Sequence, residues 1–268
     1  SSALLGLDLP LFDTGIDTPA ESAILVIAVV YGIAAAFNLR IPDTGARYAH
    51  QERNPIRLVV DFSHCFLTLW RDKLGQISLA VTTLFWGAGA TLQFIVLEWA
   101  RHALGLPLNK AAVLQGVVAL GIAVAAIAAA RAIPLKGSLR VLKVGVAMGL
   151  IVPLMTLVSS QSVAYPLLVL IGAMAGFFVV PMNALLQHRG HVLMSAGHSI
   201  AVQNFNENLN VLLMLGLYAL LIRLNLNVNW IILLFGLFVA ATMALVIRRH
   251  NANQRAFDSV ALIGEGRH

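Results

Sequence analysis

The stretch that decides how the chain folds is SAGHSIAVQNFNENLN, residues 195–210, with the apolar runs that flank it. GFFVVPMNALLQ (176–187) precedes it and VLLMLGLYALLI (211–222) follows it. Both flanks have the composition of membrane-spanning helices, so the polar stretch enters the hydrocarbon with one carboxylate, Glu207, and many amides. Polar side chains at that depth are costly and usually face a cavity or another helix.

The polar residues of this stretch have helical spacing. At about 100° per residue, a stripe roughly 100° wide holds five of them: Ser199, Gln203, Asn206, Glu207 and Asn210. Asn204 and Asn208 lie to one side of the stripe, one turn apart. A helix with one polar stripe and otherwise apolar faces is suited to the wall of a pathway.

The composition assigns the chain to integral membrane proteins. Hydrophobic residues make up 59% of it and charged residues 11%, and the mean hydropathy is +0.84; soluble domains are about one quarter charged. The net charge of +6 does not indicate nucleic-acid binding, because the basic residues lie in short loops between spans. With the single cysteine Cys65, the chain has no intrachain disulfide and no cysteine-based metal site. It begins SSALLG, without Met, and we expect it to be part of a longer protein.

The apolar runs predict seven spans, at 23–39, 76–99, 111–130, 141–158, 165–186, 195–222 and 230–247. A helix over 55–73 is predicted to lie in the membrane interface, with Phe66 and Trp70 among the residues that face lipid. Glycines four apart, such as Gly172 and Gly176, predict close helix–helix contacts. The end of the chain, 260–268, is expected to be disordered.

The basic residues predict the orientation. Lys and Arg number fifteen in the segments that begin at Arg40, Arg131, Arg189 and Arg248, and three in the alternate loops. This alternation places the 40–73 connector, a loop at 187–191 and the C-terminus on the cytoplasmic side.

The span pattern is typical of the major facilitator superfamily, which has two halves of six spans joined by a long connector. The predicted fold class is therefore all-α, a polytopic membrane protein that forms the C-terminal six-helix lobe of this fold, spans six to twelve. The predicted domains are 1–39, the end of the N-terminal lobe with span six; 40–74, the connector with its interfacial helix; 75–248, the C-terminal transmembrane lobe; and 249–268, a cytoplasmic tail.

Three stretches resemble the bacterial lysophospholipid transporter family of that superfamily: LFWGAGATLQF (84–94), GFFVVPMNALLQHRG (176–190) and AGHSIAVQNFNEN (196–208). The resemblance implies movement of lysophosphatidylethanolamine and lysophosphatidylglycerol from the outer to the inner leaflet of the bacterial inner membrane. It also implies a cytoplasmic-side acyltransferase that re-acylates them. The chain departs from the family at Gln93, where members carry Arg, so a charge-based headgroup role for this span is in doubt and the phosphate partner must come from elsewhere.

The predicted substrate-binding residues are Glu207, Gln203, Asn206, Asn210, Asn204, Asn183, Gln93 and Trp86. For Glu207 we expect contact with the headgroup or uptake of a proton or cation; the alternative is a buried carboxylate that fixes helix packing. The amides can equally follow the headgroup path or join helices. Trp86 and Gln93 either line the cavity or pack in the core.

The sequence shows no pattern typical of an enzyme or a metal site. His188, His191 and His198 have no Asp, Glu or Cys neighbour to complete a site, and no nucleophile elbow or phosphate-binding loop is present. We therefore predict no catalytic residues, no cofactor and no metal. Two alternatives to the lysophospholipid transporter stay open: an exporter of a small amphipathic solute, and a non-transporting scaffold for an acyltransferase.

Overall fold

The computed structural model describes residues 19–41 and 54–264, which divide into two compact units, Ser1–Glu52 and Arg53–His268. In the first unit the helix α1 (Pro19–Asn38) is long and apolar enough to cross a membrane. The predicted polar segment at 42–53 lies outside the described residues.

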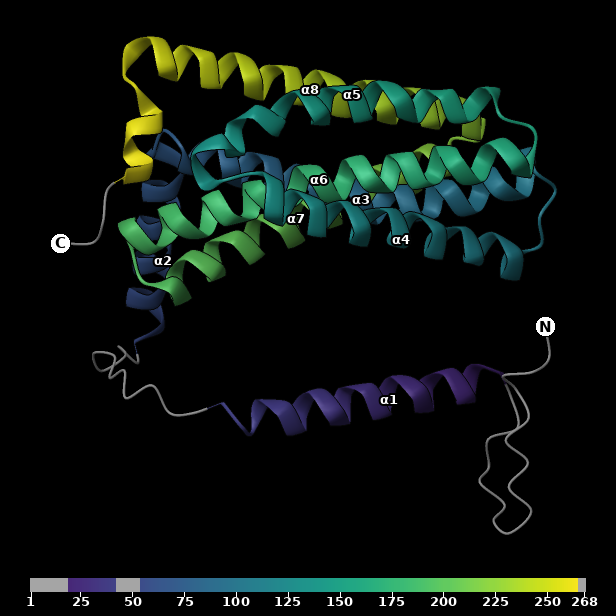
Figure 1. Ribbon diagram of the computed structural model, residues 1–268, viewed down its shortest axis with the longest axis horizontal. Helices are drawn as coiled ribbons and strands as arrows, with labels where there is room; N and C mark the ends of the chain where they lie inside the picture. Colours follow the sequence, from purple (N-terminus) through teal and green to yellow (C-terminus); the bar gives the residue numbers. More distant parts are fainter. Residues whose placement is uncertain (1–18, 42–53, 265–268) are drawn as a thin grey trace. The chain divides into compact units, whose positions relative to one another are not determined.

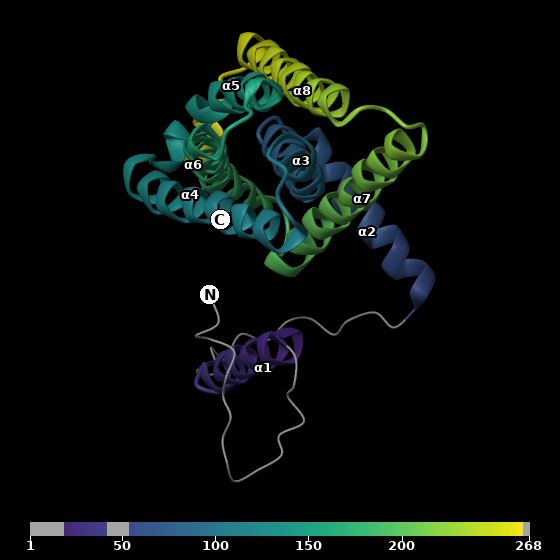
Figure 2. The ribbon, with the colours of Figure 1, turned by 90° about the vertical axis from the view of Figure 1, so that its right-hand side faces the viewer.

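The second unit is a bundle of helices (Figures 1 and 2). Its elements are α2 (Pro55–Arg71), α3 (Gly75–Ala103), α4 (Leu108–Ala132), η1 (Leu135–Val141), α5 (Leu142–Ile151), η2 (Val152–Leu157), α6 (Gln161–Leu193), α7 (Ala196–Arg223), α8 (Val228–Ala256) and η3 (Ser259–Gly264). With η1, α5 and η2 counted as one span, seven helical segments across both units can cross a membrane. The prediction of an all-α polytopic membrane protein is confirmed, and each predicted span falls on one of these segments.

The helices of the bundle pack mainly as the pairs α4 with α6, α3 with α7 and α5 with α8, and α3 also contacts α4, α6 and α8. Figure 2 shows α3 with α4 and α6 on one side, α5 and α8 on another and α7 on a third. In the α4–α6 pair, a Cβ added to Gly172 or Gly176 would lie 2.2 Å from a carbonyl oxygen of α4, that of Val118 or Ile122. The predicted close contact at these glycines is therefore present.

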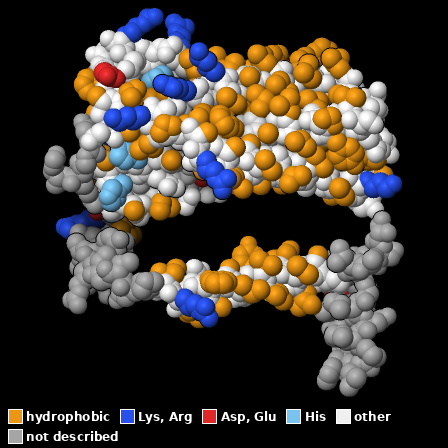
Figure 3. All heavy atoms as spheres, viewed as in Figure 1, with side chains coloured by type: hydrophobic (Ala, Val, Ile, Leu, Met, Phe, Trp, Pro, Cys, Tyr) orange, Lys and Arg blue, Asp and Glu red, His pale blue; other side chains and the backbone are white. Residues whose placement is uncertain are grey.

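Charge is distributed unevenly along the bundle. Lys, Arg and His side chains gather at the end that carries α2 and η3, and apolar atoms cover most of the middle (Figure 3). The middle therefore has the apolar surface that contact with lipid requires.

The helix predicted at 55–73 forms as α2, from Pro55 to Arg71. Asn54 is its N-cap and accepts a hydrogen bond from the backbone N of Ile56 at 3.0 Å, and Pro55 occupies the first turn. The predicted lipid-facing positions are wrong for Phe66 and Trp70, however. Both rings are half-buried against the bundle in a cluster with Leu69 and Val202, because α2 has α7 as a neighbour whose side chains bury these rings.

Two further expectations are corrected. Residues 187–191 are not a loop, since α6 continues as a helix to Leu193 and only Met194 and Ser195 separate it from α7. The end of the chain is ordered as far as Gly264, where Ile263 is buried and the Leu262 carbonyl accepts a hydrogen bond from Arg189. Both segments are ordered by contacts with distant parts of the chain. Residues 265–268 lie outside the described residues.

Candidate functional site

The polar stretch is positioned by the start of α7. Ser195 is the N-cap: its hydroxyl accepts a hydrogen bond from the backbone N of His198 at 3.3 Å. One turn later Ser199 is buried against Gly190 of α6. The short connection and this close contact hold the first turns of α7 alongside the last turns of α6.

Glu207 lies in a cluster of polar side chains between α6 and α7. Its carboxylate accepts a hydrogen bond from Gln203 Nε2 at 2.8 Å and also contacts the Thr82 hydroxyl of α3. The same Gln203 nitrogen donates to Asn183 Oδ1 of α6 at 3.2 Å. The Glu207 residue is only 9% exposed, and these contacts come from neutral groups, which leave the charge of an ionised carboxylate uncompensated.

Asn206 joins α7 to the interfacial helix. Its Oδ1 accepts a hydrogen bond from the Trp70 indole at 3.3 Å, and its Nδ2 donates to the Val202 carbonyl at 2.8 Å. Beside it, Phe205 makes edge-to-face contacts with Phe62 and Phe66, with ring centroids 5.3 and 6.2 Å apart. These contacts attach α2 to α7, the helix that carries the polar stripe.

The remaining amides of α7 divide between the bundle and the surface. Asn210 Nδ2 donates to the Thr83 carbonyl of α3 at 2.8 Å and packs directly on Gly87. Asn204 is exposed, and its carbonyl accepts a hydrogen bond from Asn208 Nδ2. The structure thus brings Glu207, Gln203 and Asn183 together, directs Asn206 and Asn210 toward other helices, and leaves Asn204 apart.

Trp86 and Gln93 line a separate cavity of about 570 Å³, which α3 and α4 border together with parts of α5, α6, α7 and α8. Among its twenty lining residues, only Gln93, Gln115 and the Trp86 indole carry polar side-chain atoms. The Gln115 Nε2 donates to the Gln93 carbonyl at 2.8 Å and so links α4 to α3. Gln115 was not among the predicted site residues, since a lone amide in an Ala-rich helix is a weak signal.

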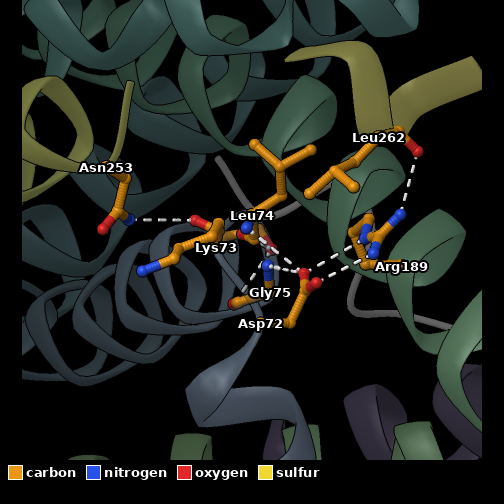
Figure 4. A network of polar contacts seen from close by, with 8 residues as sticks. Asp72, Lys73, Leu74, Gly75, Arg189, Asn253 and Leu262 are labelled. Carbon is orange, nitrogen blue, oxygen red and sulfur yellow. Dashed lines mark hydrogen bonds and ion pairs between the residues drawn. The ribbon is translucent and has the colours of Figure 1, made fainter. Parts of the chain in front are cut away.

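Sequence reasoning also missed a network at the charged end of the bundle (Figure 4). The Arg189 guanidinium binds the Asp72 carboxylate through two hydrogen bonds, of 3.1 and 2.8 Å, and its Nη1 donates to the Leu262 carbonyl. Asp72 also accepts from the backbone N of Gly75 at 2.7 Å, at the start of α3. One ion pair therefore connects α6, the α2–α3 turn and η3, which are up to 190 residues apart in sequence.

Comparison with known proteins identifies similar chains. Proteins named lysophospholipid transporter LplT match 207 residues of the chain, at 44% identity in Pectobacterium carotovorum subsp. carotovorum and 45% in Yersinia enterocolitica. The protein of that name from Yersinia pestis is 45% identical over 204 residues. The first two matches cover 77% of this chain and 51% of the relative, so the chain spans about half the length of the curated relatives it matches.

No family model matches the chain, and no solved structure does. The helices define a multi-pass membrane protein. Over 77% of its length the chain is similar to lysophospholipid transporters, and the predicted resemblance is confirmed.

Proposed function

We propose that the chain is the C-terminal half of a lysophospholipid transporter of the bacterial inner membrane, with its C-terminus in the cytoplasm. The complete protein moves lysophosphatidylethanolamine and lysophosphatidylglycerol from the outer to the inner leaflet. A cytoplasmic-side acyltransferase then re-acylates them. Two lobes of the major facilitator type rock about a central cavity in alternating access.

The observation that carries this proposal is the cluster of the buried Glu207 with the half-buried Gln203 and Asn183, in a chain similar to proteins of that name. A carboxylate held by neutral groups within the membrane is costly to retain for packing alone. It is suited to accept hydrogen bonds from an ethanolamine ammonium or from glycerol hydroxyls.

Position 93 holds a glutamine, where the family resemblance leads us to expect an arginine. Gln93 offers a neutral amide about three helical turns along α3 from Thr82, which contacts Glu207, and it lines the apolar cavity. We infer that Glu207 binds the amine or hydroxyl end of the headgroup and that the phosphate finds its partner in the other half of the protein.

The test uses the complete gene, expressed in a bacterial strain that lacks its own lysophospholipid transporter. Labelled lysophosphatidylethanolamine is added to spheroplasts, and its arrival in the inner leaflet is followed through conversion to phosphatidylethanolamine. Faster conversion than with the empty vector supports transport, provided that the acyltransferase acts on an independent substrate at the same rate in both strains. No gain over the empty vector overturns the proposal.

The variant Glu207→Gln keeps the size of the side chain and its ability to bond Gln203. We expect it to reach the membrane at normal levels and to lose most transport, because the ionised acceptor is gone. Glu98→Gln is the matched control, since Glu98 lies near the end of α3 and pairs with Arg101 outside the cluster. Unchanged transport by Glu207→Gln would remove this residue from the mechanism.

A further inference from the structure

The cavity between α3 and α4 is separate from the hydrogen-bonded cluster at Glu207, and the two adjoin. Val211, which lines the cavity, directly follows Asn210, and Trp86 lies one turn from Thr82 and Thr83, which contact Glu207 and Asn210. A polar region thus passes into an apolar one along α3 and α7.

The dimensions of the cavity are those of a lipid chain. Its volume of about 570 Å³ lies in the range of pockets that enclose small organic ligands. On α3 it extends from Phe85 to Val96, which at 1.5 Å per residue is about 16 Å of helix. An extended chain of single bonds advances roughly 1.2 Å per bond, so this length accommodates about a dozen carbon–carbon bonds.

Two glycines leave space inside the cavity. Gly89 of α3 and Gly116 of α4 both line it, and a Cβ added to either would meet no atom within 4 Å. The glycines of the α4–α6 contact differ, because there a Cβ would collide with backbone. Close helix packing therefore does not explain Gly89 and Gly116, and their lack of a side chain leaves room in the cavity for an occupant.

We propose that this cavity, bordered by Trp86, Gly89, Gln93, Gln115 and Gly116, holds the single acyl chain of the lysophospholipid while the Glu207 cluster holds its headgroup. This assignment rests on the proposed function. The apolar lining offers the chain methylenes an environment similar to the hydrocarbon they leave, and the Gln115 hydrogen bond to the Gln93 carbonyl joins the two helices that border the chain.

The proposal predicts dependence on chain length. A lysolipid that enters from the outer leaflet brings its chain from lipid and not from water, so the cavity distinguishes chains by the room it leaves for them. In the complete protein, Gly89→Leu and Gly116→Leu each add four side-chain carbons to the cavity, and the first of these, the Cβ, meets no atom within 4 Å. Transport of palmitoyl relative to lauroyl lysophosphatidylethanolamine should then fall by roughly 5- to 100-fold, the cost of overfilling an apolar site.

The control is Gly216→Leu in α7, a helical glycine whose Cβ would also meet no atom within 4 Å and which does not line the cavity. It should keep the wild-type order of chain lengths. Membrane abundance of each variant is measured alongside, and a lysolipid with a diazirine at the end of its chain is crosslinked to the wild-type protein. We expect the crosslinked lysolipid to be found on peptides from 85–96 and 115–122.

The outcomes separate the two proposals. If the wild type transports lysolipids but Gly89→Leu and Gly116→Leu keep its chain-length order, or lose all chain lengths equally, the acyl-chain assignment is overturned and the proposed function stands. Crosslinking that is confined to other segments overturns the acyl-chain assignment as well. Because the crosslinking uses the wild-type protein, this result holds even where a variant fails to fold. A wild type that transports no lysolipid overturns the proposed function itself.

Discussion

Replacing Asp72 by Asn should strongly destabilise the bundle, because it removes a charged partner that forms two hydrogen bonds with the buried Arg189. The Arg189 side chain is 2% exposed and that of Asp72 is 9% exposed. The two guanidinium–carboxylate hydrogen bonds, at 3.1 and 2.8 Å, form a bidentate pair. Asparagine retains an oxygen for the backbone N of Gly75 but carries no charge.

The magnitude follows from this burial. Breaking a buried ion pair by removing one partner costs about 3–5 kcal/mol, since the other charge stays in a low-dielectric environment. We expect a loss in this range for Asp72→Asn and for Arg189→Gln, out of a total stability on the order of 5–15 kcal/mol. The double variant should lose less than the sum of the single losses, because neither unpaired charge remains.

The assay is equilibrium unfolding of the complete protein in detergent micelles, followed by intrinsic tryptophan fluorescence, for both single variants and the double variant. Arg101→Gln is the control: its pair with Glu98 is exposed, with side chains 55% and 29% accessible, and such pairs contribute about 0–1 kcal/mol. The reasoning would be refuted if the single variants lost no more stability than Arg101→Gln does. It would also be refuted if the stability losses of the two single variants added up to that of the double variant.

Three more predictions concern the packing of the bundle. Gly176→Leu should lower the yield of folded protein and destabilise it by more than about 1–3 kcal/mol, since its Cβ would lie 2.2 Å from the Ile122 carbonyl; thermal unfolding beside Gly216→Leu measures this, and equal midpoints contradict it. Burial, with a smaller effect of the Asp61 charge, raises the pKa of the Cys65 thiol. Because the thiolate is the reactive form, alkylation of Cys65 should be slower at neutral pH than that of a free thiol with pKa of about 8.5, and should accelerate only at higher pH; a rate profile that matches glutathione would exclude this. Phe205→Ala should loosen α2 by about 0.5–1.5 kcal/mol for each lost aromatic contact, seen as faster proteolysis within 55–71, and unchanged cleavage would show that these rings do not hold the helix.

The span pattern was predictable because hydrocarbon imposes strong rules on composition. A segment that crosses the membrane must be apolar over about 20 residues and must satisfy its backbone internally. All seven spans and the start of α2 at Pro55 follow from such local signals. The boundary of α6 does not, since residues 187–193 are polar enough for a loop and become helical beside α7 and η3.

The candidate site was predictable as a set of residues but not as an arrangement. The helical spacing of Gln203, Asn206 and Glu207 identifies one stripe of α7. It does not reveal that Asn206 binds Trp70 of α2 while Glu207 and Gln203 form a cluster with Asn183 of α6. A helical pattern determines which side chains share a face, whereas the neighbour of that face depends on how the other helices pack.

By itself, the sequence determined a membrane protein with seven spans, the polar stripe on α7 and the resemblance to lysophospholipid transporters, since hydropathy, helical period and motif are properties of neighbouring residues. Only the tertiary structure decided that Asp72 pairs with Arg189, that α2 rests on Phe205, and that Gly89 and Gly116 open into a cavity. The first two contacts join residues 117 and 143 positions apart, and 27 positions separate the two glycines. Patterns of neighbouring residues do not predict such contacts, because many arrangements of the same apolar helices meet the requirements of the membrane equally well.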